Sequence, residues 1–285
     1  MPRQVIGVIG ALSDDTILLT KRSLFQTGSV DAAHKNELGG RAAIVAISIA
    51  RSFRQAPDTD DGLLPEDHVD KRDDDTPEVR VVGAVADENR QDMFSSWLRR
   101  NGVNVEGVQV VEGESTDQDK LTSLSDGSTG RSQSLNSKGV SQNWTVEHFD
   151  TVEKLGGGKR PDLVVLTMEL RRDVVEHIIQ LASDEGVTLL VYAAPGTVLL
   201  GERYRQIEHF IGSEGDAAVI LGYEAEELTV DVWPEMCEQL HSHKGIKNVV
   251  IKTGYYGAFF KNDIDEGFVS GYQSLGDVVD SSGGS

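Results

Sequence analysis

Residues 163–192 read LVVLTMELRRDVVEHIIQLASDEGVTLLVY and alternate between two hydrophobic patterns. The continuous apolar runs at 163–167 and 187–192 have the length of buried strands. Between them, 171–185 carries apolar residues at helical spacing, which predicts a helix with one inward face. The side chains predicted to face inward are Val174, Val175, Ile178, Ile179 and Leu181. Strand, helix and strand at this spacing predict parallel strands joined by a helical crossover, and hence an α/β fold whose sheet is covered on both faces.

The flanking sequence continues this alternation of strands and helices. Apolar runs predict further strands at 5–10, 16–20, 79–85, 108–111, 217–221, 248–252 and 258–260. Further helices are predicted at 41–54, 89–100, 201–208 and 231–243. The helix at 41–54 is apolar on most faces, so it is predicted to be deeply buried. In the helix at 89–100, the predicted apolar face consists of Met93, Phe94, Trp97 and Leu98.

Two segments do not fit the alternation. Residues 55–78 contain three prolines and ten acidic residues, which indicates a solvated insertion loop. A metal-binding loop is the functional alternative, but its carboxylates lack the spacing of a Ca²⁺ loop, so the insertion is favoured. Residues 112–143 are polar and rich in serine and glycine, and they receive no assignment.

Composition limits the classes of function. The chain has 285 residues and a formal net charge of −20, from 47 acidic and 27 basic side chains. Such a surface disfavours nucleic acid and anionic membranes as partners. Cys237 is the only cysteine, which excludes an internal disulfide and fits a reducing compartment. With no signal-peptide pattern and no run long enough to span a bilayer, the sequence predicts a cytoplasmic protein.

Several common site motifs are missing. The sequence contains no GxxxxGK[ST] phosphate loop, no GxSxG nucleophile elbow and no GxGxxG after its first strand. A dinucleotide-binding dehydrogenase is therefore disfavoured. His241 and His243 could ligate a metal, but positions two apart on a helix point in different directions, so a surface pair is favoured.

Polar and glycine-rich pieces instead follow the predicted strands, where open α/β sheets bind ligands. Each is weak alone, because an acid after a strand is usually a helix cap and paired glycines are usually a turn. Taken in order, the pieces are Asp14-Asp15, Gly39-Gly40, Asp87-Glu88, Glu224, the stretch KTGYYGA at 252–258 and the stretch VVDSSGGS at 278–285.

This ordered set resembles the ribokinase-like, PfkB-type carbohydrate kinases over essentially the whole chain. Residues 39–43 are similar to the family's Gly-Gly-Lys-Gly-Ala-Asn, and 83–88 resemble its Gly-x-Val-Gly-Asp-Asp. The end of the chain, DSSGGS, resembles Asp-Thr-Thr-Gly-Ala-Gly. The resemblance implies a doubly wound, mostly parallel sheet with helices on both faces and a small β lid. It implies one domain over 1–285, with lid pieces at about 15–37 and 108–144 and the acidic insertion at 55–78.

The resemblance also implies a role for each motif. Transfer of a γ-phosphoryl group from ATP to a sugar hydroxyl, with Mg²⁺, is the family's reaction. By this analogy the sugar contacts are Asp15, Gly39 and Gly40, and the metal is organised by Glu224. The nucleotide contacts are Lys252, Gly254, Gly257 and Asp280. Backbone amides of Gly283, Gly284 and Ser285 would form the anion hole for the transferred group.

The sequence departs from the family pattern at several positions. The signature Asn that binds sugar is replaced by Ile44. The Asn of Asn-Pro-Ala-Pro is replaced by Tyr192, and the Asn of Asn-x-x-Glu by Leu221, with Glu224 kept. The family's Gly-Ala-Asn after the lid matches Gly139-Val140-Ser141. In the family, the catalytic Asp comes directly after the terminal turn, one position beyond Ser285. We therefore expect a C-terminally incomplete chain with little or no kinase activity.

Two hypotheses remain open. The first is an ATP-dependent sugar kinase whose partners are a sugar and ATP. The second is a non-catalytic descendant of the same fold that binds a ligand or a partner, favoured by Ile44, Tyr192 and Leu221. The identity of the sugar is open, and so is a homodimer formed through the lid.

Overall fold

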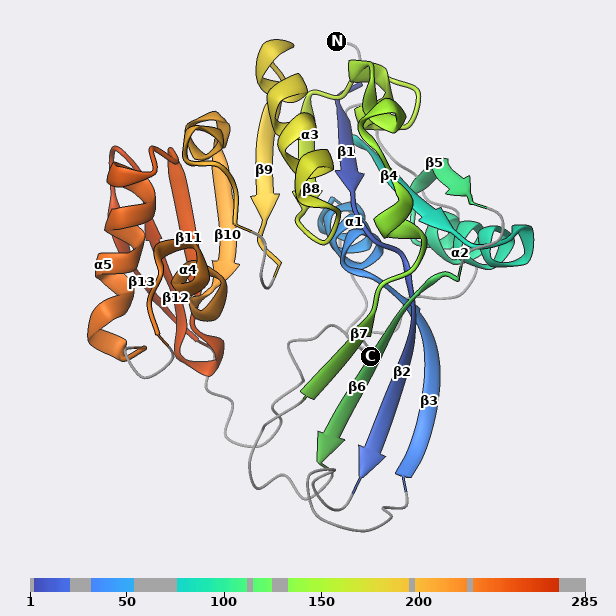
Figure 1. Cartoon of the computed structure of the whole chain (residues 1–285), viewed down its shortest axis with the longest axis horizontal. Helices are drawn as coiled ribbons and strands as arrows, with labels where there is room; N and C mark the ends of the chain where they lie inside the picture. Colours follow the sequence, from blue (N-terminus) through green and yellow to red (C-terminus); the bar gives the residue numbers. More distant parts are fainter. Residues whose placement is uncertain are drawn as a thin grey trace, which may run out of the picture. The chain divides into compact units, whose positions relative to one another are not determined.

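The computed structural model describes residues 3–20, 32–53, 76–111, 115–124, 133–194, 198–224 and 228–271. The chain forms two compact units (Figure 1). The first comprises residues 1–4 and 10–144, and the second comprises residues 5–9 and 145–285. The expectation of one domain over 1–285 stays a prediction.

The second unit contains most of a large parallel sheet. Its strands are β1 (Val5–Ile9), β8 (Leu163–Thr167), β9 (Thr188–Tyr192), β10 (His209–Ser213), β11 (Asn248–Lys252), β12 (Gly257–Lys261) and β13 (Glu266–Ser270). They are ordered β13-β12-β11-β10-β9-β8-β1. All neighbours from β1 to β11 are parallel, and β12 and β13 extend the edge as an antiparallel hairpin. The continuous apolar runs become strands because both faces are covered, and Val8, Val164 and Ile251 are fully buried.

Helices pack on this sheet. The α-helices of the second unit are α3 (Arg172–Asp184), α4 (Glu214–Leu221) and α5 (Trp233–Glu238), the last continued by the π-helix η7 (Gln239–His243). Short 3₁₀ helices are η2 (Val146–Phe149), η3 (Val152–Gly156), η4 (Gly201–Gln206), η6 (Val230–Val232) and η8 (Gly254–Tyr256). Figure 1 shows α3 beside β8 and β9, and α3 buries Val174, Val175, Ile178 and Ile179 as predicted. Leu181 is only half-buried, and Ala182 is buried in its place.

The first unit contains a parallel pair and a small second sheet. The pair is β4 (Glu78–Val85) and β5 (Asn104–Val110), accompanied by the helices α1 (Arg41–Ser52) and α2 (Glu88–Arg100). The small sheet contains β2 (Ser13–Thr20), β3 (Ala32–Gly39), β6 (Asp117–Leu124) and β7 (Gln133–Ser137), ordered β3-β2-β6-β7. The 3₁₀ helix η1 (Val140–Asn143) follows it. The predicted α/β fold, with a mostly parallel sheet, helices and a small lid-like sheet, is confirmed.

Three predictions about elements are wrong. Residues 217–221 form the end of α4, not a strand, and the strand of this region is β10. Helix α1 is not deeply buried all round: alanines at 42, 43, 46 and 50 form its buried stripe, and Ser48 and Arg51 are exposed. On α2, Met93 is 41% exposed and Ser95 is buried instead. On α1 and α2, tertiary packing determines which face is buried. Small buried residues such as Ala and Ser carry little hydrophobic signal, so the sequence did not reveal that face.

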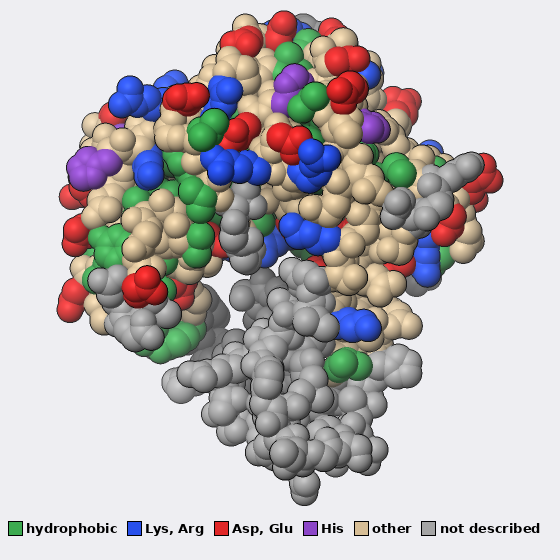
Figure 2. Space-filling model, viewed as in Figure 1, with side chains coloured by type: hydrophobic (Ala, Val, Ile, Leu, Met, Phe, Trp, Pro, Cys, Tyr) green, Lys and Arg blue, Asp and Glu red, His purple; other side chains and the backbone are tan. Residues whose placement is uncertain are grey.

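The acidic segment at 55–78 lies outside the described residues as far as 75, and its last residue begins β4. No helix in the described part of the chain is long and apolar enough to cross a membrane. On the face shown in Figure 2, acidic and basic side chains are interspersed.

Candidate active site

Three residues predicted to contact a substrate lie together in the first unit. Asp15 belongs to β2, and Gly39 ends β3, the antiparallel neighbour of β2. A Cβ added to Gly39 would lie 1.9 Å from Asp15 Oδ2, so only glycine leaves room for this carboxylate. Gly40 follows at the N-cap of α1 with a φ of 93°. A Cβ there would lie 2.4 Å from the carbonyl oxygen of Ala11, so the chain passes close to its neighbours where α1 begins.

Asp15 belongs to a row of carboxylates across the small sheet. Asp119 of β6 and Glu37 of β3 are its register partners, so the three side chains share one face. Burial raises the pKa of Asp15 to about 6, against a hydrogen bond of 2.5 Å from Ser13 Oγ, and the charge of Asp119 adds to the rise. Burial also raises the pKa of Asp119, although Arg41 opposes it.

A second carboxylate of β6 anchors the chain that follows β7. Asp117 is buried and accepts hydrogen bonds from the backbone amides of Gly139 (2.9 Å) and Ser141 (3.1 Å). The hydroxyl of Ser141 donates to the same carboxylate. Ser141, which stands where the family has Asn, therefore ties η1 to the small sheet. Asp117 and Asp119 were missed by the sequence analysis, although the alternation of acids at 117 and 119 is the signal of a strand with one polar face.

In the second unit, polar side chains gather where β9, β10 and β11 end. Ile211 of β10 is the register partner of Tyr192, and Ser213 is the partner of Lys252. Because residues two apart on a strand point to one face, Tyr192 and Lys252 lie on the same face across β10. Lys252 Nζ donates a hydrogen bond to Tyr192 Oη and lies 4.6 Å from the centre of the ring.

The predicted nucleotide-side turn follows β11 directly. Its backbone is closed by a 2.9 Å hydrogen bond from Thr253 N to the carbonyl of Gly257. Gly254 adopts a φ of 58°, and a Cβ there would contact nothing within 4 Å. A Cβ on Gly257 would instead lie 2.0 Å from the carbonyl oxygen of Val269. Gly257 is therefore required by the β12–β13 hairpin itself, whereas Gly254 leaves a backbone surface open to a ligand.

The predicted metal residue, Glu224, is exposed and follows α4 and its C-cap Gly222, not a strand. Two carboxylates lie in the first turn of α4, directly after β10, and the buried one of them is Asp216. Its Oδ2 accepts hydrogen bonds from Ser213 N (2.9 Å) and Ser213 Oγ (2.7 Å). Ser213 and Asp216 have the spacing of the family's Asn-x-x-Glu, and they were missed because 217–221 looked like the strand.

The described side chains do not form a metal site by themselves. Among the residues it describes, no group of three or more His, Cys, Asp or Glu side chains could hold a metal ion. A single carboxylate is nonetheless enough for Mg²⁺ when phosphate oxygens and water supply the remaining ligands. The residues present therefore fit a metal held mainly by a nucleotide.

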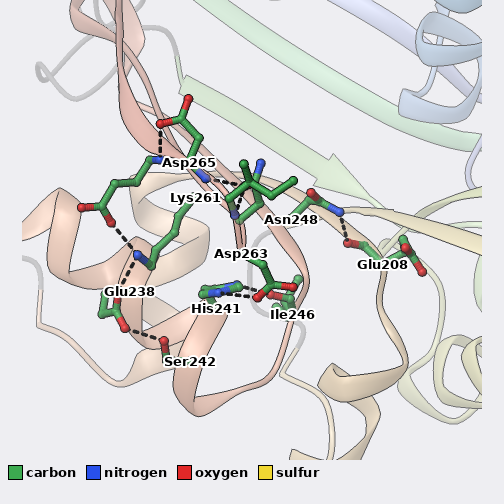
Figure 3. Close-up of polar contacts among 12 residues, drawn as sticks. Glu208, Glu238, His241, Ser242, Ile246, Asn248, Lys261, Asp263 and Asp265 are labelled. Carbon is green, nitrogen blue, oxygen red and sulfur yellow. Dashed lines mark hydrogen bonds and ion pairs between the residues drawn. The ribbon is translucent and has the colours of Figure 1, made fainter.

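The hairpin beside the turn is fixed to α5 and η7 by charged contacts (Figure 3). Lys261 of β12 forms ion pairs with Glu238 (2.9 Å) and Glu266 (2.5 Å). His241 Nε2 lies 3.3 Å from Asp263 Oδ1, and its Nδ1 lies 2.8 Å from the carbonyl oxygen of Ile246. His241 is therefore held by contacts with the β12–β13 loop and with the chain that follows η7.

The remaining predicted site residues separate into two groups. Asp280, Gly283, Gly284 and Ser285 lie outside the described residues. Ile44 is half-buried in the first turn of α1, where its amide donates to Gly40 O (3.1 Å), and Leu221 is the last residue of α4.

Known proteins resemble this chain over most of its length. The family model for the pfkB family carbohydrate kinases matches residues 4–283. A ribokinase from Schizosaccharomyces pombe is 25% identical over 261 residues, which are 90% of this chain and 74% of that protein.

Solved structures share the fold at low identity. A ribokinase from Giardia lamblia superposes with a TM-score of 0.75 at 16% identity, covering 98% of this chain and 78% of the other. A ribokinase from Arabidopsis thaliana, solved with ribose and ATP, gives a TM-score of 0.68 at 16% identity, covering 95% and 78%. With the family model spanning nearly all of its residues, this chain belongs to the pfkB family of carbohydrate kinases.

Proposed function

We propose that this protein is an ATP-dependent carbohydrate kinase that transfers the γ-phosphoryl group to a sugar hydroxyl. Family membership supports the general class. The observation that carries the proposal is the packing of Asp15 against Gly39, with Gly40 next to it at the start of α1. It supports the proposal because a carboxylate and a close-approaching backbone are the groups that the family resemblance assigns to the sugar contacts.

The chemistry of these groups suits a polyhydroxylated substrate. An ionised carboxylate only accepts hydrogen bonds, so Asp15 would receive the hydroxyl protons of a sugar. Asp119 and Glu37 offer further acceptors on the same face of the small sheet. Neighbouring hydroxyls of one sugar would therefore be oriented by more than one carboxylate, which fixes the position of the reacting hydroxyl.

For the nucleotide, we propose that Lys252 and the turn at Gly254 and Gly257 lie along the phosphates, with Asp280 beside them. Gly283, Gly284 and Ser285 would supply backbone amides to the transferred group, where negative charge develops in the transition state. Mg²⁺, when bound with ATP, would neutralise phosphate charge. Two carboxylates are candidates for holding it: Glu224, by sequence match, and Asp216, by its position after β10.

The second candidate function is a ligand-binding protein that keeps the fold but not the reaction. Ile44 favours it, because its side chain can neither donate nor accept a hydrogen bond where the family uses Asn. The loss of one buried polar contact to a sugar costs about 1–3 kcal/mol. Such a loss weakens recognition of a hydroxylated substrate without removing the row of carboxylate acceptors around Asp15.

One experiment separates the two functions. Purified 285-residue protein is incubated with Mg·ATP and a panel of pentoses and hexoses, and sugar-dependent ADP release is measured. Sugar and ATP binding are measured in parallel by calorimetry, with Asp15→Asn as the control. Turnover that the control lacks supports the kinase, and binding of both ligands without turnover supports the binding protein. If neither ligand binds, both proposals fail.

Localisation and oligomeric state are further proposals. We propose a cytoplasmic protein, and a homodimer formed through the small sheet is the oligomer that the analogy favours. Analytical ultracentrifugation measures the mass directly, and a monomer at micromolar concentration would contradict the dimer.

A further inference from the structure

Among the residues that the structure describes, Lys252 has no carboxylate partner, although the protein is very acidic. The chain carries a net charge of −20, yet no ion pair between described residues includes Lys252. Two other lysines of the same unit are neutralised: Lys261 contacts two glutamates, and Lys247 pairs with Glu208 at 2.8 Å. The side chain of Lys252 is exposed at the end of β11, on the edge of the sheet where α/β proteins bind ligands.

Its partner is the neutral phenol of Tyr192. The ammonium donates a hydrogen bond to Tyr192 Oη and also lies 4.6 Å from the ring centre. Both residues end parallel strands that flank β10, so their backbones are fixed by the sheet. Tyr192 is half-buried, which leaves its ring less free to move than a surface side chain. A flexible lysine is therefore held at one place by two interactions with one rigid group.

We propose that Tyr192 is a positioning residue, which holds the Lys252 ammonium at the carboxyl end of β11 as an uncancelled charge for the polyphosphate of a nucleotide. The inference rests on the proposed function. A carboxylate in place of the phenol would hold the lysine equally well but would cancel the charge that a phosphate needs. A neutral partner removes conformational freedom before binding and leaves the charge available. On this proposal, the replacement of the family's Asn by Tyr192 changes how the phosphate site is built and does not abolish nucleotide binding.

The chain provides a matched control. Lys244 also lies over a tyrosine ring, that of Tyr204, at 5.1 Å. It precedes β11 instead of ending it, so it lies toward the opposite end of that strand. Removal of its charge changes the net charge of the protein by the same amount as removal of the Lys252 charge, without touching the proposed site.

The test uses inorganic tripolyphosphate as the probe, because it carries the phosphate charges without adenine and needs no catalysis. Its affinity for the 285-residue protein is measured by calorimetry at low salt. We expect Lys252→Met to weaken binding about tenfold or more, and Tyr192→Phe, which keeps the ring, about threefold to fivefold. Lys244→Met should bind as the wild type does. Circular dichroism of each variant verifies that it is folded.

A double variant distinguishes positioning from a general structural effect. In the Lys252→Met background, Tyr192→Phe should cause no further loss, because it acts only through the lysine. An equal loss in both backgrounds would overturn the inference, as would wild-type affinity in Tyr192→Phe or no tripolyphosphate binding by the wild type. Sugar-dependent ADP release is assayed on the same samples. Probe binding without turnover counts against the kinase alone, and turnover without probe binding counts against this inference alone.

Discussion

Gly39 lies against the carboxylate of Asp15 so closely that a Cβ on Gly39 would be 1.9 Å from Asp15 Oδ2. The contact joins the end of β3 to the middle of β2. No rotation of an added methyl group can relieve an overlap of this size, so either the carboxylate or the strand must move. Because Asp15 is the proposed sugar acceptor, a change at Gly39 acts on the site without altering any of its polar groups.

The first prediction concerns Gly39→Ala. We expect the displaced Asp15 carboxylate to lower sugar affinity by about tenfold or more, since misplacement by an ångström is costly at such sites. Calorimetric titration with the preferred sugar measures the effect, and ATP affinity should stay the same. Gly201→Ala is the matched control, because a Cβ there contacts nothing within 4 Å and its φ is not in the left-handed region. Wild-type sugar affinity in Gly39→Ala would contradict the assignment of Asp15.

The second prediction concerns pH and stability. The pKa of Asp15 is raised to about 6 in the folded protein from 3.8, mainly by burial. The folded state therefore holds this proton more tightly than the unfolded state. Ionising Asp15 costs stability as the pH rises from about 4 to 6, and the cost is complete above pH 6. We expect Asp15→Asn to be more stable than the wild type by about 1–2 kcal/mol at pH 7, allowing for partial exposure of the group.

Urea unfolding at several pH values checks this sign. The stability difference between Asp15→Asn and the wild type should shrink towards zero as the pH falls to 4. The same variant should lose sugar affinity, because it lacks the carboxylate that is proposed to accept the sugar hydroxyls. A function that needs a buried charge is often kept at the expense of stability. A variant that is less stable than the wild type at pH 7 would show that Asp15 stabilises the fold instead.

Helices and strands could be predicted where the spacing of the apolar residues and the length of the segment indicated the same element. Residues 163–192 satisfy both, and β8 and α3 lie within a residue or so of the prediction. The run at 217–221 is short and apolar, so period alone could not separate a strand from a buried helix. The helix α4 begins at a capping box. The Ser213 side chain accepts from the backbone amide of Asp216, and the Asp216 side chain accepts from the backbone amide of Ser213.

The site was predictable only where one short motif carries it. Asp15, Gly39 and Gly40 could be proposed as site residues because a carboxylate and two glycines occupy positions along the chain that match the family's motifs. Asp119 was not found, because its role depends on β6 pairing with β2, a contact between segments about a hundred residues apart. Polar strands of a small sheet have no hydrophobic period that would reveal such a pairing.

The third prediction separates the two candidates for the metal. We expect Asp216→Asn to reduce the gain in ATP affinity that Mg²⁺ provides, because Asp216 lies in the first turn of α4, the helix that follows β10. Glu224→Gln should leave that gain unchanged. Asp216→Asn should also cost about 1 kcal/mol of stability through the weakened helix cap. Calorimetry with and without Mg²⁺, together with urea unfolding, measures both effects. The reverse pattern in the metal effect would assign the role to Glu224.

The fourth prediction concerns the buried guanidinium of Arg80, in the strand β4. Arg80 is fully buried, and its two terminal nitrogens each lie 2.5 Å from a carboxylate, those of Glu78 and Glu106. Glu78 is itself mostly buried, so Arg80→Met takes the Arg80 cation away from a buried carboxylate. We expect a loss of about 3–5 kcal/mol in the free energy of unfolding, measured in urea.

Two variants verify the cause of that loss. Arg99→Met removes an exposed arginine of α2 and should change stability by less than about 0.5 kcal/mol. In Arg80→Met combined with Glu78→Leu, most of the stability should return, because a buried ion pair replaced by apolar groups of similar volume is about neutral. Glu106 is largely exposed, so its own loss of partner costs little. If the double variant were no more stable than Arg80→Met alone, the loss in the free energy of unfolding would come from lost packing around the Arg80 side chain. It would not come from the Glu78 charge that Arg80 balances in the wild type.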